Sequence, residues 1–452
     1  MNIVIVGLGK FGIELTEHLS KENHNIIVID TKQSIIEDIV GQFDVKGYCG
    51  NGASYLTQKE AFDGKDTDLL IATTSTDEAN ILCCLVAKKL GVNQTIARVR
   101  NPEYALQAQL MHNELGISMT LNPDLDTAIE IFRILRYPSA LQVESFANGK
   151  VDLVEIKIDA NSLLKDTSLV KIKDKYKVKI LICAVKRNEE VIIPNGDFTL
   201  KEGDYVYVTA DSKELATAFK KLKLVQSRLS STMIIGGGKI TYYLASMLLE
   251  NNISVKIIEK DKNICKVLSE LLPKALIING EGTNQKLLLS EGISDVDSTV
   301  SLTGMDETNI VISSFANTLN LKKVVTKVSN SNYDLILKNV GLDIVVSPKE
   351  IFSSHIIRYV RGMANTLDSE FKTLYRLVGN KVEALEFVIS KATSYTSIPL
   401  KDLHIKKNYL LACIIRENQV IIPSGKDTLE PLDSVVIVTT NTSLMDVSEI
   451  LE

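Results

Sequence analysis

Six residues near the start of the chain form a glycine pattern that can hold phosphate groups. They read Gly7-Leu8-Gly9-Lys10-Phe11-Gly12, directly after an apolar, β-branched run and directly before a stretch of helical periodicity. In such a turn the first glycine makes the bend, the second lets the backbone approach a pyrophosphate, and the third lets the helix pack on the strand. Free N–H groups and the helix dipole then hold the phosphates. The turn could also be purely structural, but its context favours nucleotide binding.

A carboxylate stands where such a site needs one. Asp30 closes the apolar run 25–30, 23 residues after Gly7, in the position from which a carboxylate hydrogen-bonds the adenosine ribose. Because a 2′-phosphate would meet this carboxylate as a like charge, we expect NAD or ATP rather than NADP. The alternative is that Asp30 only caps the helix that follows.

The same features recur 229 residues later, which indicates an internal duplication. The matching pairs are Gly7 and Gly236, Asp30 and Glu259, Asn80 and Asn309, Arg98 and Lys327, Pro194 and Pro423, and Asp204 and Asp433. The second glycine loop reads Gly236-Gly237-Gly238-Lys239-Ile240-Thr241. Thr241 replaces the third glycine, and its Cβ is expected to push the helix away from the strand. We therefore expect the second site to be weaker or empty.

Further polar residues follow the other predicted strands, at the edge of the sheet where ligands of such folds bind. These candidates are Asn51, Gly52, Thr73, Thr74 and Arg98 in the first copy, and Glu281, Thr303 and Lys327 in the second. Arg98 or Lys327 could neutralise a phosphate, although a surface salt bridge is an equally simple interpretation. Asp77, Glu78 and Asn80 are expected to begin a helix rather than to contact a ligand.

The chain divides into four predicted domains. Residues 1–122 and 230–350 alternate short apolar runs with amphipathic stretches, which predicts an α/β fold with two Rossmann-like, doubly wound parallel sheets. Residues 140–225 and 370–452 are rich in short strands and predict a small β-rich α+β module after each sheet. Helical connectors are expected to join each sheet to its module.

Composition and missing motifs exclude several function classes. A net charge of −5 and a pI near 5.8 give no reason to bind nucleic acid. The six cysteines form no CxxC pair or Cys/His cluster, so no metal site is predicted. Neither a signal peptide nor an apolar run long enough to span a membrane is found. The five histidines do not recur at the 229 offset, and hydrolase and phosphoryl-transfer motifs are missing. Regulation without catalysis is the favoured interpretation.

Taken together, these residues resemble the regulatory subunits of Trk-type potassium uptake systems, the TrkA family. The resemblance rests on GLGKFG with Asp30, the Gly50-Asn51-Gly52 loop, Thr73, ARVRNPEY from Ala97 to Tyr104, and the ending IIPNGDFTLKEGDYVYV, all in tandem. It implies two RCK units, a homo-oligomer (dimer or tetramer), and a cytoplasmic position on the inner face of the plasma membrane, held by an integral-membrane potassium channel subunit. NAD(H), or ATP and ADP, would shift the gate. Where the family usually has an aspartate, this chain has Asn51, which leaves the base preference open.

Two other hypotheses stay open at this point. The fingerprint alone would also suit an NAD-dependent oxidoreductase with its active site between the halves. A structural scaffold with vestigial pockets is the third possibility.

Overall fold

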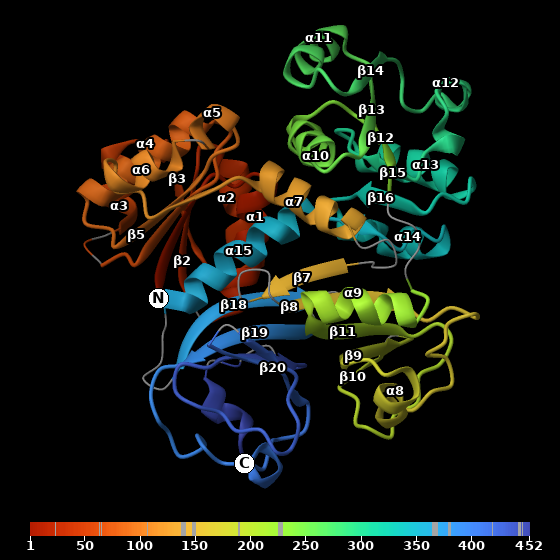
Figure 1. Ribbon diagram of the computed structural model, residues 1–452. Coiled ribbons are helices and arrows are strands. Elements are labelled where there is room, and N and C mark those ends of the chain that lie inside the picture. The colour runs from red at the N-terminus through yellow and green to blue at the C-terminus, as the bar shows by residue number, and fades with distance from the viewer. Residues whose placement is uncertain are drawn as a thin grey trace.

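The computed structural model describes residues 1–22, 24–62, 64, 66–105, 107–136, 142–146, 151–188, 190–224, 229–363, 369–377, 381–417, 419–441, 444 and 446–452. These residues form two parallel six-stranded sheets and two antiparallel five-stranded sheets. The predicted class, two Rossmann-like sheets each followed by a small β-rich module, is confirmed (Figure 1).

The first parallel sheet has the strand order β3-β2-β1-β4-β5-β6. Its strands are β1 (Asn2–Val6), β2 (Asn25–Asp30), β3 (Lys46–Cys49), β4 (Leu69–Ala72), β5 (Gln94–Arg98) and β6 (Met119–Leu121). The helices are α1 (Lys10–Ser20), α2 (Gln33–Gln42), α3 (Tyr55–Phe62), α4 (Asp77–Lys89), α5 (Pro102–Ala105) and α6 (Ala108–Asn113). The chain reverses its strand order between β1 and β4, and this switch point opens a crevice at the carboxyl ends of the strands.

The second parallel sheet repeats this order as β14-β13-β12-β15-β16-β17. Its strands are β12 (Ser231–Ile235), β13 (Ser254–Glu259), β14 (Leu276–Asn279), β15 (Ser298–Ser301), β16 (Lys323–Lys327) and β17 (Val345–Val346). The helices are α10 (Lys239–Glu250), α11 (Lys262–Leu271), α12 (Gln285–Ser290), α13 (Asp306–Asn317) and α14 (Asp334–Asn339). Central strands such as β1 and β12 are buried almost throughout, because helices cover both faces of each sheet.

The two small modules pack against each other. The first contains β7 (Gln142–Phe146), β8 (Val151–Lys157), β9 (Leu181–Arg187), β10 (Glu190–Ile192), β11 (Tyr205–Asp211), α8 (Leu169–Tyr176) and α9 (Ser212–Lys221). The second contains β18 (Ser369–Leu377), β19 (Val382–Ile389), β20 (Tyr409–Arg416), β21 (Gln419–Ile421) and β22 (Ser434–Thr439). One apolar cluster joins side chains of both, including Tyr207 and Cys183 from the first and Cys413 and Val436 from the second.

The two connecting helices are exchanged between the halves. α7 (Pro123–Arg136) leaves the first sheet and packs on α10 of the second unit, whereas α15 (Pro348–Met363) leaves the second sheet and packs on α1 of the first. Figure 1 shows both helices running between the two Rossmann-like units. The apolar face of each helix completes the other half's core: Phe352, Ile356 and Val360 join the first core, and Ile131 and Ile134 join the second.

Candidate nucleotide-binding sites

The first glycine loop has the geometry that its sequence predicts. Gly7 has a φ of +91°, and a Cβ there would come within 2.7 Å of the Thr74 backbone nitrogen, so only glycine fits. A Cβ on Gly12 would lie 2.0 Å from the Gly7 carbonyl oxygen, which shows how closely α1 approaches the loop. A Cβ on Gly9 would meet nothing within 4 Å. The loop therefore leaves open the place where a pyrophosphate would lie against the start of α1.

Asp30 holds this loop from the end of β2. Its Oδ2 accepts a hydrogen bond from the Leu8 N–H at 2.7 Å, and its Oδ1 accepts one from the Lys32 N–H at 3.0 Å. The carboxylate thus fixes the glycine loop and the turn that leads into α2, whose N-cap is Lys32 and has no side-chain cap. A carboxylate offers about four acceptor positions, so Asp30 can still accept hydrogen bonds from ribose hydroxyls.

Asn80 ties together the ends of β4 and β5. Its Oδ1 accepts hydrogen bonds from the backbone and hydroxyl of Thr74, both at 2.7 Å, and its Nδ2 donates to the Arg98 carbonyl at 2.8 Å. Asp77 begins α4, and its carboxylate accepts the N–H groups of Arg100 and Asn101. These residues shape the crevice from behind, in agreement with the expectation that they act structurally.

Arg98 is a buried cation at the wall of the crevice. Only 6% of its surface is exposed, and its guanidinium lies over the Phe11 ring, 5.1 Å from the ring centre. It donates a hydrogen bond to the Thr74 carbonyl, while its Nε has no partner among the described residues. Burial lowers the pKa of Arg98 to about 10, so the side chain is still protonated at neutral pH. A buried positive charge with an unused donor suits an anionic ligand.

These groups surround a cleft of about 470 Å³, within the size range of ligand sites. Of the residues predicted for the first site, the cleft is lined by Gly7, Leu8, Gly9, Lys10, Phe11, Asp30, Asn51, Gly52, Thr73, Thr74 and Arg98. Gly12 packs behind the loop instead. The sequence interpretation missed Thr31, Lys32, Ile35, Ser75, Ala79 and Cys83, which also line the cleft. Lys32 and Ile35 could have been inferred, since they follow Asp30 into the next helix.

Asn51 makes a local turn at the rim of the cleft. Its Oδ1 accepts the Ala53 N–H at 3.0 Å. The amide can therefore still donate from its NH₂ group and accept at its oxygen, so it offers both kinds of hydrogen bond to a ligand. Gly52 is required for packing, because a Cβ there would lie 2.0 Å from a methyl group of Val6.

The second site reproduces the same framework. Glu259 accepts the Gly237 N–H at 2.5 Å and the Asp261 N–H at 2.7 Å. Asn309 binds Thr303 and the Lys327 carbonyl as Asn80 binds their counterparts. The Lys327 amine donates to the Thr303 carbonyl at 2.5 Å, and burial lowers its pKa.

Other predicted residues of this half take different places. Gly236 has a φ of +106°, and Gly238 leaves open space as Gly9 does. Lys239 and Glu281 are exposed, whereas Ile240 is 8% exposed and joins the apolar core.

Thr241 fits the second loop through a hydrogen bond. Its hydroxyl donates to the Gly236 carbonyl at 2.6 Å, and the side chain is fully buried. In the first half the Thr73 hydroxyl donates to the equivalent Gly7 carbonyl at 2.8 Å. Leu302 takes the position of Thr73 in the second half. The hydroxyl that donates to the loop carbonyl thus comes from the end of a strand in the first half and from the start of a helix in the second. This hydrogen bond offsets the cost expected for the Cβ of Thr241.

Charges from the two sites converge on one carboxylate. Asp124, at the start of α7, is part-buried, and desolvation raises its pKa. Arg100 and Arg98 of the first half and Lys239 and Lys327 of the second act on it in the opposite direction. The two glycine loops therefore lie within electrostatic reach of each other.

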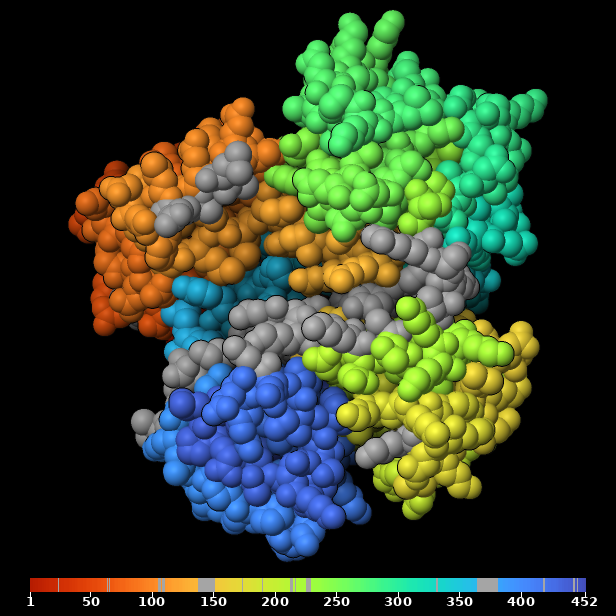
Figure 2. Space-filling model, in the orientation of Figure 1, coloured from red at the N-terminus to blue at the C-terminus, as the bar shows by residue number. Residues whose placement is uncertain are grey.

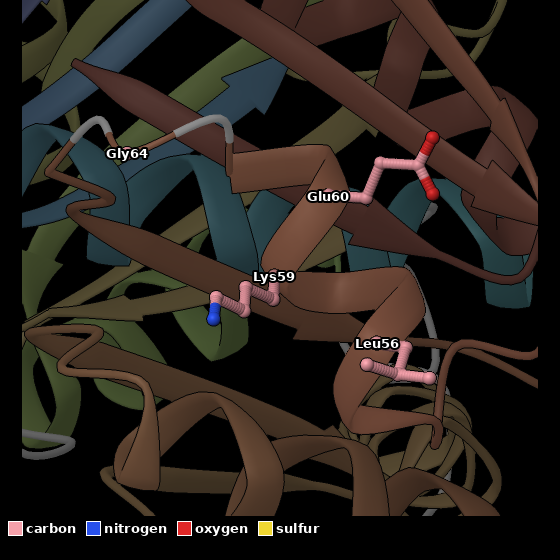
Figure 3. Close-up of a pocket in the computed structure, with 4 residues that line it drawn as sticks. All are labelled: Leu56, Lys59, Glu60 and Gly64. Carbon is pink, nitrogen blue, oxygen red and sulfur yellow. The ribbon is translucent and has the colours of Figure 1, made fainter.

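Two further observations bear on function. A second hollow is lined by Leu56, Lys59, Glu60 and Gly64, none of them predicted site residues, and Figure 3 shows Lys59 and Glu60 pointing in different directions. Across the described part of the chain, no helix has the length and apolarity to cross a bilayer, and no group of three or more metal-ligating side chains occurs.

Comparison with known proteins agrees with this architecture. The TrkA-N domain model matches residues 3–123 and 232–348, and the TrkA-C domain model matches 153–223, which confirms the tandem repeat. TrkA homolog 1 of the Trk potassium uptake system of Methanosarcina mazei is 31% identical over 447 residues, covering 97% of each chain. Homolog 2 of the same organism is 29% identical and covers all of both chains.

Among solved structures, the "GsuK channel bound to NAD" superposes with a TM-score of 0.64 at 16% identity, covering 97% of this chain and 76% of that one. This similarity supports the fold. The relatives cited here are named as transport proteins and channels rather than enzymes. On its sequence identity over nearly the full length and on both domain matches, the chain belongs to the TrkA family of potassium uptake proteins.

Proposed function

We propose that this chain is a nucleotide-sensing regulatory subunit of a Trk-type potassium transport system. It binds NAD(H), or ATP and ADP, in the glycine-loop cleft and gates an integral-membrane partner at the inner face of the membrane. The first site uses the loop from Gly7, with Asp30, Asn51, Thr73 and Arg98. The second uses the loop from Gly236, with Glu259, Glu281, Thr303 and Lys327. Residues 1–122, 140–225, 230–350 and 370–452 are its four domains.

The observation that carries this proposal is the combination of an open Gly9 cradle with the buried Arg98 cation. The cleft provides backbone donors, a positive charge and a carboxylate, which are the groups that a nucleotide's phosphates and ribose require. Family membership and an NAD-bound structure of the same fold support the same ligand class.

A nucleotide can act on the gate through the exchanged helix. The Phe11 ring lies under Arg98 and packs edge-on against Phe352 of α15, 5.1 Å between ring centres. At the other end of α15, Arg361 binds Glu22 of the first unit and Glu383 of the last module, both at 2.8 Å. A ligand that prefers one position of α15 shifts the equilibrium by its differential affinity, and roughly 1 to 3 kcal/mol suffices for a 5- to 150-fold effect.

Calorimetric titration of the purified chain with NADH, NAD, ATP and ADP tests the proposal. We expect micromolar or tighter binding of at least one of them, and loss of binding at the first site in Gly9→Asp. The change of potassium uptake by the same nucleotide, measured in cells lacking the native regulatory subunit, tests the gating step. If no adenine nucleotide binds, the sensor function is wrong.

A further inference from the structure

The helix α11 exposes a stripe of apolar side chains. Ile264, Val267 and Leu271 are 39%, 53% and 55% exposed. Their spacing places them on one face of the helix, beside the buried face formed by Cys265 and Leu268. These three side chains are therefore largely open to solvent in the described part of the chain.

The stripe is confined to one face of the second sheet. Leu268 of α11 and the following Leu272 share an apolar cluster with Ile257 of β13, whereas Leu288 of α12 packs with Ile258 on the other face, so the exposed Leu289 of α12 does not belong to it. Figure 1 places α11, β14 and α12 at the end of the second unit farthest from the small modules, and Figure 2 shows this end projecting from the body of the molecule. We call Ile264, Val267 and Leu271, with the lysines of α11 and its ends, the α11 surface.

The lysines give this surface a positive charge. Between residues 260 and 274 there are four exposed lysines and only two acidic residues, although the whole chain carries a net charge of −5. The lysines are Lys260, Lys262, Lys266 and Lys274. One of the acids, Asp261, caps the helix by accepting the N–H groups of Asn263 and Ile264.

The first half of the chain provides an internal control. At the repeat offset of 229, Val267 and Leu271 correspond to the polar Asp38 and Gln42, and Lys262 and Lys266 correspond to Gln33 and Glu37. Ile264 corresponds to the apolar Ile35, which lines the first cleft. Since α2 forms without the other apolar and basic residues, the fold does not require them.

We propose that the α11 surface docks on an anionic lipid bilayer. A basic helix with one exposed apolar face lies in the headgroup region, where lysines attract acidic lipids and the apolar side chains enter the acyl boundary. The charge of the surface is complementary to such headgroups and opposite to that of the remaining chain. Ile264 borders the second glycine loop, since a Cβ on Gly237 would lie 2.9 Å from its side chain, so the test below leaves Ile264 unchanged.

Co-sedimentation of the full chain with vesicles tests this docking. We expect binding to phosphatidylcholine vesicles containing about one-third phosphatidylglycerol, weakening as salt rises. Replacing Lys262→Gln and Lys266→Gln together should weaken binding about 25-fold, at about fivefold for each lysine. Val267→Ser with Leu271→Ser should weaken it about tenfold at unchanged charge. All four side chains are exposed, so these variants are expected to fold.

The control is made in α2 at the first-half counterparts of Lys266 and Val267, one position from each tested pair. Glu37→Gln with Asp38→Asn should leave vesicle binding unchanged. Equal binding to pure phosphatidylcholine, or wild-type binding by both α11 variants, would overturn the proposal. So would light scattering that shows the variants changing the oligomeric state instead, because the surface would then bind a second copy. Nucleotide titration of the same variants should be unaltered, which keeps a failure here separate from a failure of the sensor function.

Discussion

The two glycine loops make the same contacts with different residues. In the first half, Gly12 allows α1 to approach the loop, and Thr73 satisfies the loop carbonyl. In the second half, Thr241 satisfies that carbonyl from the helix, and Leu302 replaces the strand threonine. The comparison teaches that a fingerprint position is defined by the contact it makes, and that a departure in one residue is to be read together with its neighbour across the loop.

A second exchange accompanies the first. The short Asp30 faces Leu8, whereas the longer Glu259 faces Gly237, where a Cβ would come within 2.9 Å of the glutamate side chain. The second half thus combines a longer acid with a smaller loop residue than the first half. Both halves nevertheless keep the hydrogen bond from the loop N–H to the carboxylate.

The largest effect is expected when the threonine of the second glycine loop is placed in the first loop without the leucine that accompanies it. Gly12→Thr places a Cβ against the Gly7 carbonyl, so the free energy of unfolding should fall by about 4 kcal/mol and binding at the first site should be lost. Denaturant unfolding and calorimetry measure both. Adding Thr73→Leu recreates the arrangement of the second half and should recover part of the stability. If the double variant is no more stable than the single one, the two positions are not coupled.

The next effect concerns how each sheet meets the exchanged helix. Gln94 of β5 accepts a hydrogen bond from the Tyr359 hydroxyl of α15 at 2.9 Å, while its counterpart Lys323 of β16 donates to the Ile134 carbonyl of α7. Burial lowers the pKa of Lys323 to about 7, from an ordinary value of 10.5. Between these two values the unfolded chain binds more protons, so this residue should make the unfolding free energy rise with pH by about 1 kcal/mol per unit.

Lys323→Gln should remove that slope, because it gives the second half the side chain of the first. Denaturant unfolding at a series of pH values from 7 to 10 measures the effect. Lys322→Gln is the matched control, since Lys322 is part-exposed and pairs with Asp297. A slope that persists in Lys323→Gln would show that another group carries it.

Gly9→Asp should weaken nucleotide binding at one site and spare the fold. A side chain there meets open space and brings a negative charge to the phosphate position, so affinity at the first site should fall about 100-fold with little change in melting temperature. Gly238→Asp is the equivalent change in the second half. Equal losses from both variants would show that both halves bind nucleotide, whereas an effect of Gly9→Asp alone would leave the second half as a structural copy.

The smallest effect is expected from making the two cations alike. Arg98→Lys loses the stacking on Phe11 and should reduce nucleotide affinity about fivefold, equivalent to about 1 kcal/mol. Lys327→Arg gains no such partner, because the counterpart of Phe11 is Ile240. We therefore expect its affinity to stay near that of the original chain, as calorimetry would show.

Much of the fold could be predicted from the sequence because its signals are local. Apolar runs such as 2–6 and 69–72 specify buried parallel strands, and the glycine spacing specifies the turn between β1 and α1. The cleft residues followed from one rule, that ligands bind at the carboxyl ends of the strands. Asp30 and Arg98 could be placed in this way without coordinates.

The exchange of α7 and α15 could not be predicted in the same way. Their apolar faces are visible in the sequence, but an apolar stripe does not say which sheet will cover it, and the sequence suggested simple connectors. The role of Thr241 was missed for a related reason. Its bond to Gly236 depends on a helix position that only the packed structure defines.

The exchanged helices also determine what becomes of the chain when it is divided. Each half ends its Rossmann-like sheet with a helix that fits the other half, so a separated half would expose the face formed by Ile131 and Ile134, or by Phe352 and Ile356. Each fragment carries the connecting helix that completes the core of the other. Co-expressed as separate polypeptides cut between the halves, they should reassemble by fragment complementation, and the duplicated chain would then behave as a dimer whose subunits happen to be covalently joined.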